Sequence, residues 1–186
     1  MAKKNKFETN AIHVGNKPDT STGSVSPPIH LTSTFVQDGV GKNKGFDYSR
    51  GTNPTRERLE KNIASLEGGY DAIAFSSGMA ATTALFQSLK QGDHVIISRN
   101  VYGGTYRMTT QILNNHGLKF DFVDTTNIQN IKNVIKSETK WIFIETPTNP
   151  MLEITDIKAV SQICHDHNLK FAIDNTFMSP FGQRPI

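Results

Sequence analysis

The chain has 186 residues, of which 36% are hydrophobic and 20% are charged, and its formal net charge at pH 7 is +3. This length allows one domain with a core, or part of a larger one, and so small a charge excess implies no nucleic-acid partner. The single cysteine, Cys164, excludes an internal disulfide and a multi-cysteine zinc site.

The sequence lacks the signatures of a membrane protein. No apolar run reaches the roughly 20 residues that a membrane span needs, and polar residues follow the N-terminus where a signal peptide would have an apolar core. The six histidines are scattered without the spacing of metal ligands. We therefore predict a soluble, cytoplasmic protein with no membrane partner and no metal. The one basic cluster, Lys3, Lys4 and Lys6, is interpreted as solvated charge.

Residues 1–52 are predicted to form an extended N-terminal arm, because most of this range is rich in Ser, Thr, Gly and Pro and lacks sustained periodicity. A helix is predicted next. Asn53 and Pro54 have the pattern of a helix start, and Gly68 and Gly69 that of a helix end. The apolar residues between them share one helix face: Leu59, Ile63 and Leu66.

Short apolar runs then alternate with helix-compatible segments. The predicted strands are AIAF at 72–75, VIIS at 95–98, FDFV at 120–123, WIFIE at 141–145 and FAID at 171–174. The predicted helices between them are 79–89, 104–114, 128–135 and 157–167. Because most of the strands are continuous apolar runs, helices should cover both faces of their sheet. The alternation predicts an α/β domain with a mainly parallel sheet over residues 53–186.

The last predicted strand lies near the end of the chain. The sequence stops at Ile186 with no closing helix and no polar tail, a pattern that indicates a domain cut short. The domain over residues 53–186 is therefore predicted to be incomplete.

In an open α/β sheet, ligands bind beyond the carboxyl ends of the strands, so the residues that follow each apolar run are the candidates. The run at 72–75 is followed by Ser76, Ser77, Gly78 and Met79, a turn of small residues whose N–H groups can hold a phosphate at a helix N-terminus. The alternative is an ordinary strand-to-helix turn with a serine cap. The sequence has no GxGxxG and no GxxxxGK[ST] after a strand, which argues against a dinucleotide fold and a P-loop.

An aromatic residue follows the second run, where Tyr102 precedes Gly103 and Gly104. The ring of Tyr102 can stack on a flat cofactor, or it can pack under a glycine turn. In the arm, Tyr48 and Arg50 lie just before the first predicted helix. Arginine suits bidentate phosphate recognition and a tyrosine hydroxyl can add a hydrogen bond, whereas the alternative for Arg50 is a solvated charge.

Two carboxylates close the last two predicted strands, Glu145 and Asp174. A partly desolvated Asp174 needs a cationic partner or several hydrogen bonds, and a protonated pyridine nitrogen would be such a partner. The alternative for Asp174 is a turn cap, because Asn175 and Thr176 follow it. Glu145 is equally compatible with a cofactor contact and with a structural ion pair.

A phosphate-type turn, a ring stacker, a strand-end aspartate and an arginine-bearing arm are together the parts of a pyridoxal-phosphate site. The stretches that carry a more specific likeness are TNAIHVG, PPIHLTSTF, GFDYSRGTNPTRERLE, FSSGMAAT, DHVIISRNVYGGT, ETPTNP and DNTFMSP. In their residues and their order, these stretches resemble the N-terminal half of the Cys/Met-metabolism (trans-sulfuration) family, from about Thr9 to Ile186. The resemblance implies a fold type I large domain and pyridoxal 5′-phosphate as cofactor.

The resemblance also implies roles for individual residues near the cofactor phosphate and ring. Ser77, Gly78 and Met79 would hold the phosphate. Tyr102 would stack on the pyridine ring, and it is the one catalytic side chain that we predict in this chain. Asp174 would pair with the ring nitrogen and keep it protonated.

The remaining implied roles concern support and assembly. Thr176 would lie close to the ring, Asn149 near the phenolic oxygen, and Glu145 would support that network. Tyr48 and Arg50 would reach the phosphate of a neighbouring subunit. The family therefore implies a homo-oligomer, either a dimer that shares its active sites or a tetramer built from such dimers.

The family's Schiff-base lysine lies in a Ser-x-Thr-Lys segment beyond the DNTF motif, and no lysine follows Lys170 in this chain. Lys170 opens the last predicted strand, on the edge opposite the ligand side, and is not a substitute. The arginine that binds the substrate carboxylate in relatives is also missing. We therefore expect this chain to hold most of the cofactor cradle and to be inactive alone.

For the complete enzyme, the resemblance implies γ-elimination on cystathionine-like sulfur amino acids. The stretches NTFMSPFGQRP and GFDYSRGTNPTR favour this cystathionine γ-lyase reaction. The alternatives are methionine γ-lyase activity and γ-replacement, as in cystathionine γ-synthase or O-acetylhomoserine sulfhydrylase. A further alternative is a catalytically dead short chain that acts only by associating with other subunits.

Overall fold

The computed structural model describes residues 6–186. Lys3 and Lys4, and with them the start of the predicted arm, lie outside the described residues. The chain divides into two compact units, one that extends to Ala74 and includes Ile186, and one formed by Phe75–Pro185. None of the helices in residues 6–186 is long and apolar enough to cross a bilayer.

The first unit contains a helix that was not predicted, α1 (Phe7–His13), and the predicted helix α2 (Pro54–Glu67). The side-chain amide of Asn62 in α2 donates hydrogen bonds to the carbonyl oxygens of Asn10, Ala11 and Val14, over 3.1, 3.2 and 2.9 Å. These bonds hold the end of α1, where the Asn10 carbonyl also accepts from the Val14 amide over 3.1 Å. A side chain distant in the sequence thus stabilises α1, and the local sequence carries no sign of it.

Between residues 14 and 53 the chain forms no helix and no strand, only the isolated bridges Thr34–Tyr48 and Gly39–Lys42. Helix α2 begins as predicted, because the Asn53 side chain accepts hydrogen bonds from the first-turn amides. It ends at Gly68, whose φ of 78° is a left-handed conformation that glycine adopts without strain.

The second unit is built on a parallel sheet of four strands in the order β2-β1-β3-β4. Its strands are β1 (His94–Ser98), β2 (Lys119–Val123), β3 (Thr139–Glu145) and β4 (Lys170–Asp174). These are four of the five predicted strands. All strands run the same way, so their carboxyl ends meet at one edge of the sheet, and the register places Glu145 beside Asp174 there.

The prediction of a strand at 72–75 is wrong. The segment is extended but pairs with no strand among the described residues, and Ile73 and Phe75 are 75% and 45% exposed. The N–H groups of Ala72 and Ala74 are bonded instead to side chains, those of Asp71 and Glu60. An apolar run provides the right residues for a strand, but the hydrogen-bond ladder that defines one needs a neighbour.

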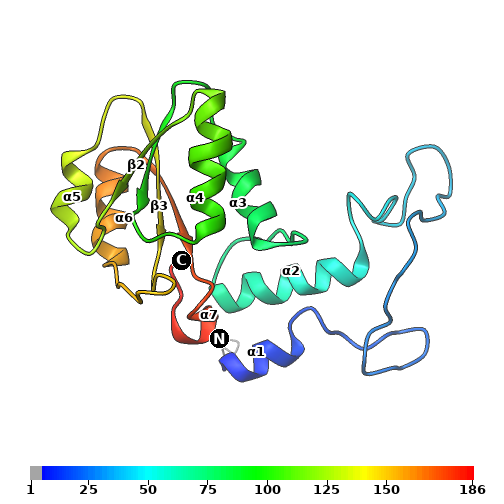
Figure 1. The fold of residues 1–186 in the computed structure, drawn as a ribbon. Helices are drawn as coiled ribbons and strands as arrows, with labels where there is room; N and C mark the ends of the chain where they lie inside the picture. The colour runs from blue at the N-terminus through cyan, green and yellow to red at the C-terminus, as the bar shows by residue number, and fades with distance from the viewer. Residues whose placement is uncertain (1–5) are drawn as a thin grey trace. The chain divides into compact units, whose positions relative to one another are not determined.

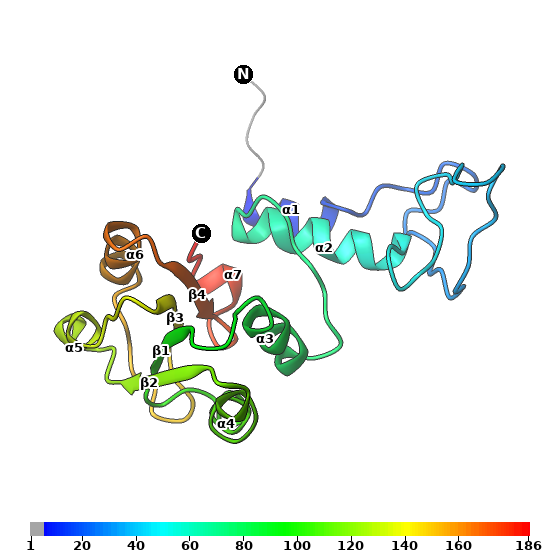
Figure 2. The ribbon, with the colours of Figure 1, turned by 90° about the horizontal axis from the view of Figure 1, so that it is seen from above.

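Helices cover both faces of the sheet, as predicted (Figures 1 and 2). They are α3 (Gly78–Phe86), α4 (Gly103–Arg107), α5 (Ile128–Asn133) and α6 (Ile157–Asp166). The short α7 (Ser179–Gly182) follows β4. The predicted helix at 104–114 is present as α4 followed by a π-helical turn, Met108–Ile112, and a 3-10 turn, Leu113–His116.

The core lies on both sides of the sheet, because successive strand residues point to opposite faces. Ile96, Ile142 and Ile144 pack on one face with Val160 and Ile163 of α6. On the other face, Val95, Ile97 and Phe143 pack with Phe86 of α3 and Met108. The strands are thus held by two apolar layers, and this rigid sheet presents its carboxyl edge to the site.

Candidate functional site

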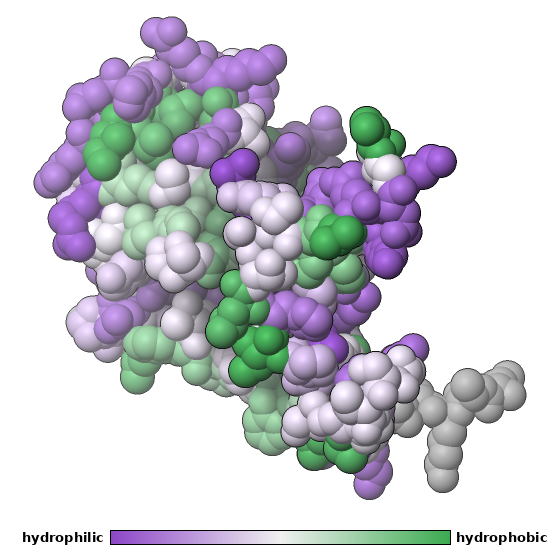
Figure 3. All heavy atoms as spheres, turned by 90° about the vertical axis from the view of Figure 1, so that its right-hand side faces the viewer, coloured by the Kyte–Doolittle hydropathy of each residue, from purple (hydrophilic) through white to green (hydrophobic). Residues whose placement is uncertain are grey.

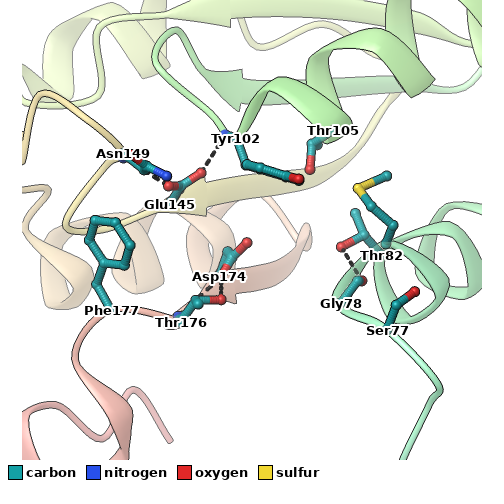
Figure 4. Close-up of a pocket in the computed structure, with 11 residues that line it drawn as sticks. Ser77, Gly78, Thr82, Tyr102, Thr105, Glu145, Asn149, Asp174, Thr176 and Phe177 are labelled. Atoms are coloured by element: carbon teal, nitrogen blue, oxygen red, sulfur yellow. Dashed lines mark hydrogen bonds between the residues drawn. The ribbon is translucent and has the colours of Figure 1, made fainter.

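A cavity of about 330 Å³ opens at the carboxyl edge of the sheet in the second unit (Figure 4). The start of α3, the start of α4 and the ends of β3 and β4 form its walls. The residues that line it are Ser77, Gly78, Met79, Thr82, Tyr102, Thr105, Glu145, Asn149, Asp174, Thr176 and Phe177.

The start of α3 forms one wall. The hydroxyl of Ser77 caps the helix by accepting a hydrogen bond from the Ala80 amide over 3.1 Å. In the described part of the chain, the amide N–H groups of Gly78 and Met79 have no acceptor. A Cβ added to Gly78 would meet nothing within 4 Å, so the backbone faces open space. Two free amides at a helix N-terminus suit an anion.

Tyr102 lies on the opposite wall, as the residue that precedes the first turn of α4. A Cβ on Gly104 would stand 2.5 Å from the Tyr102 ring and 2.7 Å from the Met79 sulfur, both closer than atoms can pack. Glycine is therefore required at position 104 for the ring to lie where it does. Tyr102 is 46% exposed and its ring lies along the cavity, so a flat ligand can stack on it (Figure 4).

Glu145 is a buried carboxylate that ties two loops together. Its Oε2 accepts a hydrogen bond from the Tyr102 amide over 2.5 Å, and its Oε1 accepts one from the Asn149 amide over 2.9 Å. Burial raises the pKa of Glu145, the two amide hydrogen bonds act against that rise, and the nearby charge of Asp174 adds to it. Among residues 6–186, the partners of the Glu145 carboxylate are these two amides and no salt bridge joins it to a cation.

Asp174 ends β4 and lies beside Glu145. Its Oδ1 accepts hydrogen bonds from the amide and the hydroxyl of Thr176, over 3.1 and 2.5 Å. Its Oδ2 has no partner within residues 6–186. No lysine, arginine or histidine of the described chain lines the cavity, although two carboxylates do. This end of the cavity therefore attracts a cation, and a protonated pyridine nitrogen fits that requirement.

The structure brings eight of the ten predicted cofactor-binding residues to this one cavity. They are Ser77, Gly78, Met79, Tyr102, Glu145, Asn149, Asp174 and Thr176. Tyr48 and Arg50 belong to the first unit, where the Arg50 guanidinium lies over the Tyr48 ring at 4.9 Å from its centroid. Lys170 lies at the opposite end of β4 from Asp174, as predicted, with its ammonium over the Trp141 ring.

Sequence analysis missed three lining residues, Thr82, Thr105 and Phe177. Helical spacing could have identified Thr82, which lies one turn after Gly78, and Phe177 belongs to the DNTF stretch. Thr105 follows Tyr102 by three residues, but nothing in the sequence distinguishes it from the neighbouring threonines.

Comparison with known proteins identifies relatives along almost the whole chain. The profile of a family described as "Cys/Met metabolism PLP-dependent enzyme" matches residues 8–186. A probable cystathionine gamma-synthase from Herpetosiphon aurantiacus is 46% identical over 180 residues, which cover 97% of this chain and 56% of that protein. A cystathionine beta-lyase from Lactococcus lactis subsp. cremoris is 46% identical, with 97% of this chain and 47% of that protein covered.

A solved structure has the same fold. The crystal structure of cystathionine gamma-lyase from Lactobacillus plantarum, complexed with L-serine, superposes with a TM-score of 0.94 at 45% sequence identity. The match covers 97% of this chain and 47% of that one. The chain thus spans about half the length of the relatives that it matches.

Proposed function

Because the chain belongs to the Cys/Met metabolism family of pyridoxal-phosphate-dependent enzymes, we propose that it is the N-terminal part of a trans-sulfuration enzyme and carries most of its cofactor site. The match over residues 8–186 confirms the family predicted from the sequence, and with it pyridoxal phosphate as the family's cofactor. One observation carries the proposal: a free helix N-terminus, an exposed ring and a half-satisfied carboxylate share a single cavity.

Different lining residues bind different parts of the cofactor. The Ser77 turn, with the free amides of Gly78 and Met79, binds the phosphate. Tyr102 presents its ring face to the pyridine ring and so excludes water from one side of it. When bound, pyridoxal phosphate supplies a protonated pyridine ring that takes up the electron pair released when the Cα–H bond of an amino acid breaks.

Asp174 sets the charge of that ring. Its free Oδ2 holds a proton on the pyridine nitrogen, while the two hydrogen bonds from Thr176 keep the carboxylate in place. Thr176 itself lies close to the ring. Glu145 fixes the backbone of Tyr102 and of Asn149, and the Asn149 side chain binds the phenolic oxygen.

Assembly forms the second part of the proposal. Tyr48 and Arg50 bind the phosphate held by a neighbouring subunit, so that the protein works as a homo-oligomer, a dimer with shared sites or a tetramer. Residues 1–52 then act as the arm, and residues 53–186 as the incomplete cofactor domain.

The surface of the arm supports its role in assembly. Apolar side chains of the first unit are largely exposed, among them Val25 at 80%, Leu31 at 93% and Val36 at 85%. Figure 3 shows apolar side chains reaching the surface on the face that it presents. Another chain that covered these exposed side chains would remove apolar surface from water.

The reaction that we propose for the complete protein is γ-elimination on a cystathionine-like substrate. The three relatives described above are a γ-synthase, a β-lyase and a γ-lyase at 45–46% identity, so identity alone favours none of these reactions. The β-lyase reaction was not considered from the sequence. The β-lyase relatives make it the second candidate.

The products of cystathionine distinguish these reactions in the protein purified from its natural source. Cleavage of the Cγ–S bond yields cysteine, 2-oxobutanoate and ammonia, whereas cleavage of the Cβ–S bond yields homocysteine, pyruvate and ammonia. We expect 2-oxobutanoate. Pyruvate in its place would move the assignment to β-elimination. Formation of cystathionine from cysteine and an activated homoserine, with no 2-oxo acid, would move it to γ-replacement.

A cytoplasmic location, and the inactivity of the 186-residue chain alone, stay predictions. The second follows from the cavity, because no lysine of the described chain lines it. A group that attaches the cofactor covalently and moves the Cα proton would then have to come from elsewhere in the complete protein.

A further inference from the structure

The first turn of α4 contains a buried hydroxyl group, that of Thr105, whose place in the structure no hydrogen bond within residues 6–186 accounts for. Thr105 is 1% exposed, yet its Oγ1 has no hydrogen-bond partner within residues 6–186. A buried hydroxyl without a partner is unfavourable, because it loses its hydrogen bonds to water and gains none in return. Such a group is retained where a ligand supplies the missing partner.

Neighbouring threonines show why Thr105 is exceptional. Threonine in a helix usually donates to the carbonyl four residues earlier, as Thr83 does to Met79 over 2.7 Å and Thr109 does to Thr105 over 2.8 Å. The corresponding residue for Thr105 is Val101, which lies before α4 begins. The next carbonyl, that of Tyr102, already accepts from the Tyr106 amide over 3.0 Å. Neither carbonyl accepts a hydrogen bond from the Thr105 hydroxyl, which is left without a backbone acceptor in the described chain.

The position of Thr105 indicates which ligand group it meets. Thr105 lines the cavity, and its hydroxyl points into the space between the Tyr102 ring and the start of α3 (Figure 4). The two helix starts lie against each other, because Gly104 leaves room for the Met79 sulfur. The free amides of Gly78 and Met79 lie across that space, at the start of α3 (Figure 4).

Charge separates the two ends of the cavity. The carboxylates of Glu145 and Asp174 lie at the strand ends and repel an anion, whereas the helix start carries free N–H groups and attracts one. An anionic oxygen is therefore expected at the helix end, where the Thr105 hydroxyl can donate to it.

We propose that the Thr105 hydroxyl is a third donor to the ligand phosphate, next to the amides of Gly78 and Met79. This inference rests on the proposed function, because it takes the phosphate-bearing cofactor of the family as the occupant. It adds to the site a residue that neither the sequence motifs nor the resemblance assigned.

The test compares two probes that differ only in the phosphate, pyridoxamine 5′-phosphate and pyridoxamine. Neither carries an aldehyde, so neither attaches to surface lysines. Equilibrium dialysis of the 186-residue chain gives their dissociation constants. For Thr105→Val, which keeps the shape and removes the hydroxyl, we expect weaker binding of pyridoxamine 5′-phosphate by roughly tenfold and unchanged binding of pyridoxamine. Thr105→Ser should bind like the parent chain.

Thr109→Val is the matched control. Thr109 is fully buried in the same stretch but donates to backbone carbonyls and does not line the cavity. Its substitution should lower the unfolding temperature and leave the dissociation constants unchanged. Thr105→Val should instead weaken the binding of pyridoxamine 5′-phosphate and leave the unfolding temperature of the ligand-free chain unchanged. A fall for Thr105→Val would show that the hydroxyl has an internal structural partner, and would overturn the inference.

Two further results would also overturn it. Equal weakening of both probes by Thr105→Val would place the hydroxyl at another part of the ligand. Unchanged binding of pyridoxamine 5′-phosphate would remove Thr105 from the site while the proposed function stands. Failure of the folded parent chain to bind pyridoxamine 5′-phosphate at all would overturn both the inference and the proposed cofactor site.

Discussion

At the scale of single residues, the side chains of the cavity combine roles that the sequence presents as alternatives. Ser77 caps α3 and also lines the cavity. Asp174 caps its own turn through Oδ1 and leaves Oδ2 for a ligand. Tyr102 packs against Gly104 and still exposes its ring face. A structural role for a residue is therefore no argument against a functional one, because different atoms of the same side chain can serve the two roles.

Asp174 provides the sharpest prediction for a single residue. In the complete protein, Asp174→Asn keeps the shape and loses the charge that holds a proton on the pyridine nitrogen, so turnover should fall on the order of 100-fold or more. Steady-state kinetics measures the loss, and Asp174→Ala should show a similar one. The unfolding temperature should stay close to that of the parent protein, because Oδ2 makes no internal bond in residues 6–186. Unchanged turnover with an intact fold would remove Asp174 from the proposed site.

At the scale of elements, contacts between distant segments decide which local patterns become structure. Helix α1 forms where α2 supplies Asn62, and the apolar run at 72–75 forms no strand where no neighbour pairs with it. The face of α2 shows the same effect, because Leu66 is buried while Leu59 and Ile63 are 53% and 38% exposed. Periodicity identifies the face, but only a packing partner buries it.

The contact between α1 and α2 can be tested with Asn62→Ala. Loss of three hydrogen bonds to the end of α1 should destabilise the first unit by roughly 1–3 kcal/mol and should speed amide exchange across Phe7–His13. Hydrogen exchange followed by mass spectrometry measures this. Lys61→Ala in the same helix is the control, since its exposed pair with Glu57 contributes little. Equal exchange in both variants would mean that α1 does not depend on Asn62.

A histidine with a lowered pKa, His94, lies at the start of β1, at the edge of the sheet opposite the cavity. His94 is fully buried, with Nδ1 bonded to the Thr139 hydroxyl over 2.8 Å and Nε2 3.2 Å from Asp121. Burial lowers the pKa of His94 from its ordinary 6.5, and the charge of Lys136 lowers it further, while Asp121 and Glu138 act less strongly in the other direction. The folded chain therefore keeps His94 neutral at a pH where the unfolded chain protonates it.

The sign of the pH effect follows from that difference. Below about pH 6.5 the unfolded state binds a proton that the folded state does not, so the free energy of unfolding falls as the pH falls. The unfolding temperature of the parent chain should drop between about pH 7 and pH 5 more steeply than that of His94→Gln, which cannot titrate there. Parallel curves for the two chains would show that His94 has no part in the acid sensitivity.

At the scale of the whole molecule, the proposed cofactor cavity has, among the described residues, no lining group that could attach the cofactor. No lysine of residues 6–186 lines it, and the chain spans about half the length of its relatives. Borohydride reduction converts an imine between pyridoxal phosphate and a lysine into a stable adduct. Reduction of the 186-residue chain with its cofactor should therefore leave no stoichiometric adduct on a single lysine.

Peptide mapping by mass spectrometry measures that outcome. The protein from its natural source, reduced in the same way, is the comparison. We expect it to carry one phosphopyridoxyl group on a chain about twice as long, in proportion to the 47% coverage of its relatives. A stoichiometric adduct at Lys170 of the 186-residue chain would contradict the prediction and would make the short chain a candidate for an active form.

The sequence by itself determined the α/β class, the strands β1 to β4, the ends of α2 and eight of the cavity residues. It could do so because hydrophobic periodicity, helix caps and strand-end positions are local properties of a chain. Within residues 6–186, only the tertiary structure decided that α1 forms, that 72–75 stays unpaired, that Glu145 binds amides and not a cation, and that the Thr105 hydroxyl is left without a partner. These outcomes depend on which segments of the chain come into contact in the fold, and local sequence patterns do not show which segments those are.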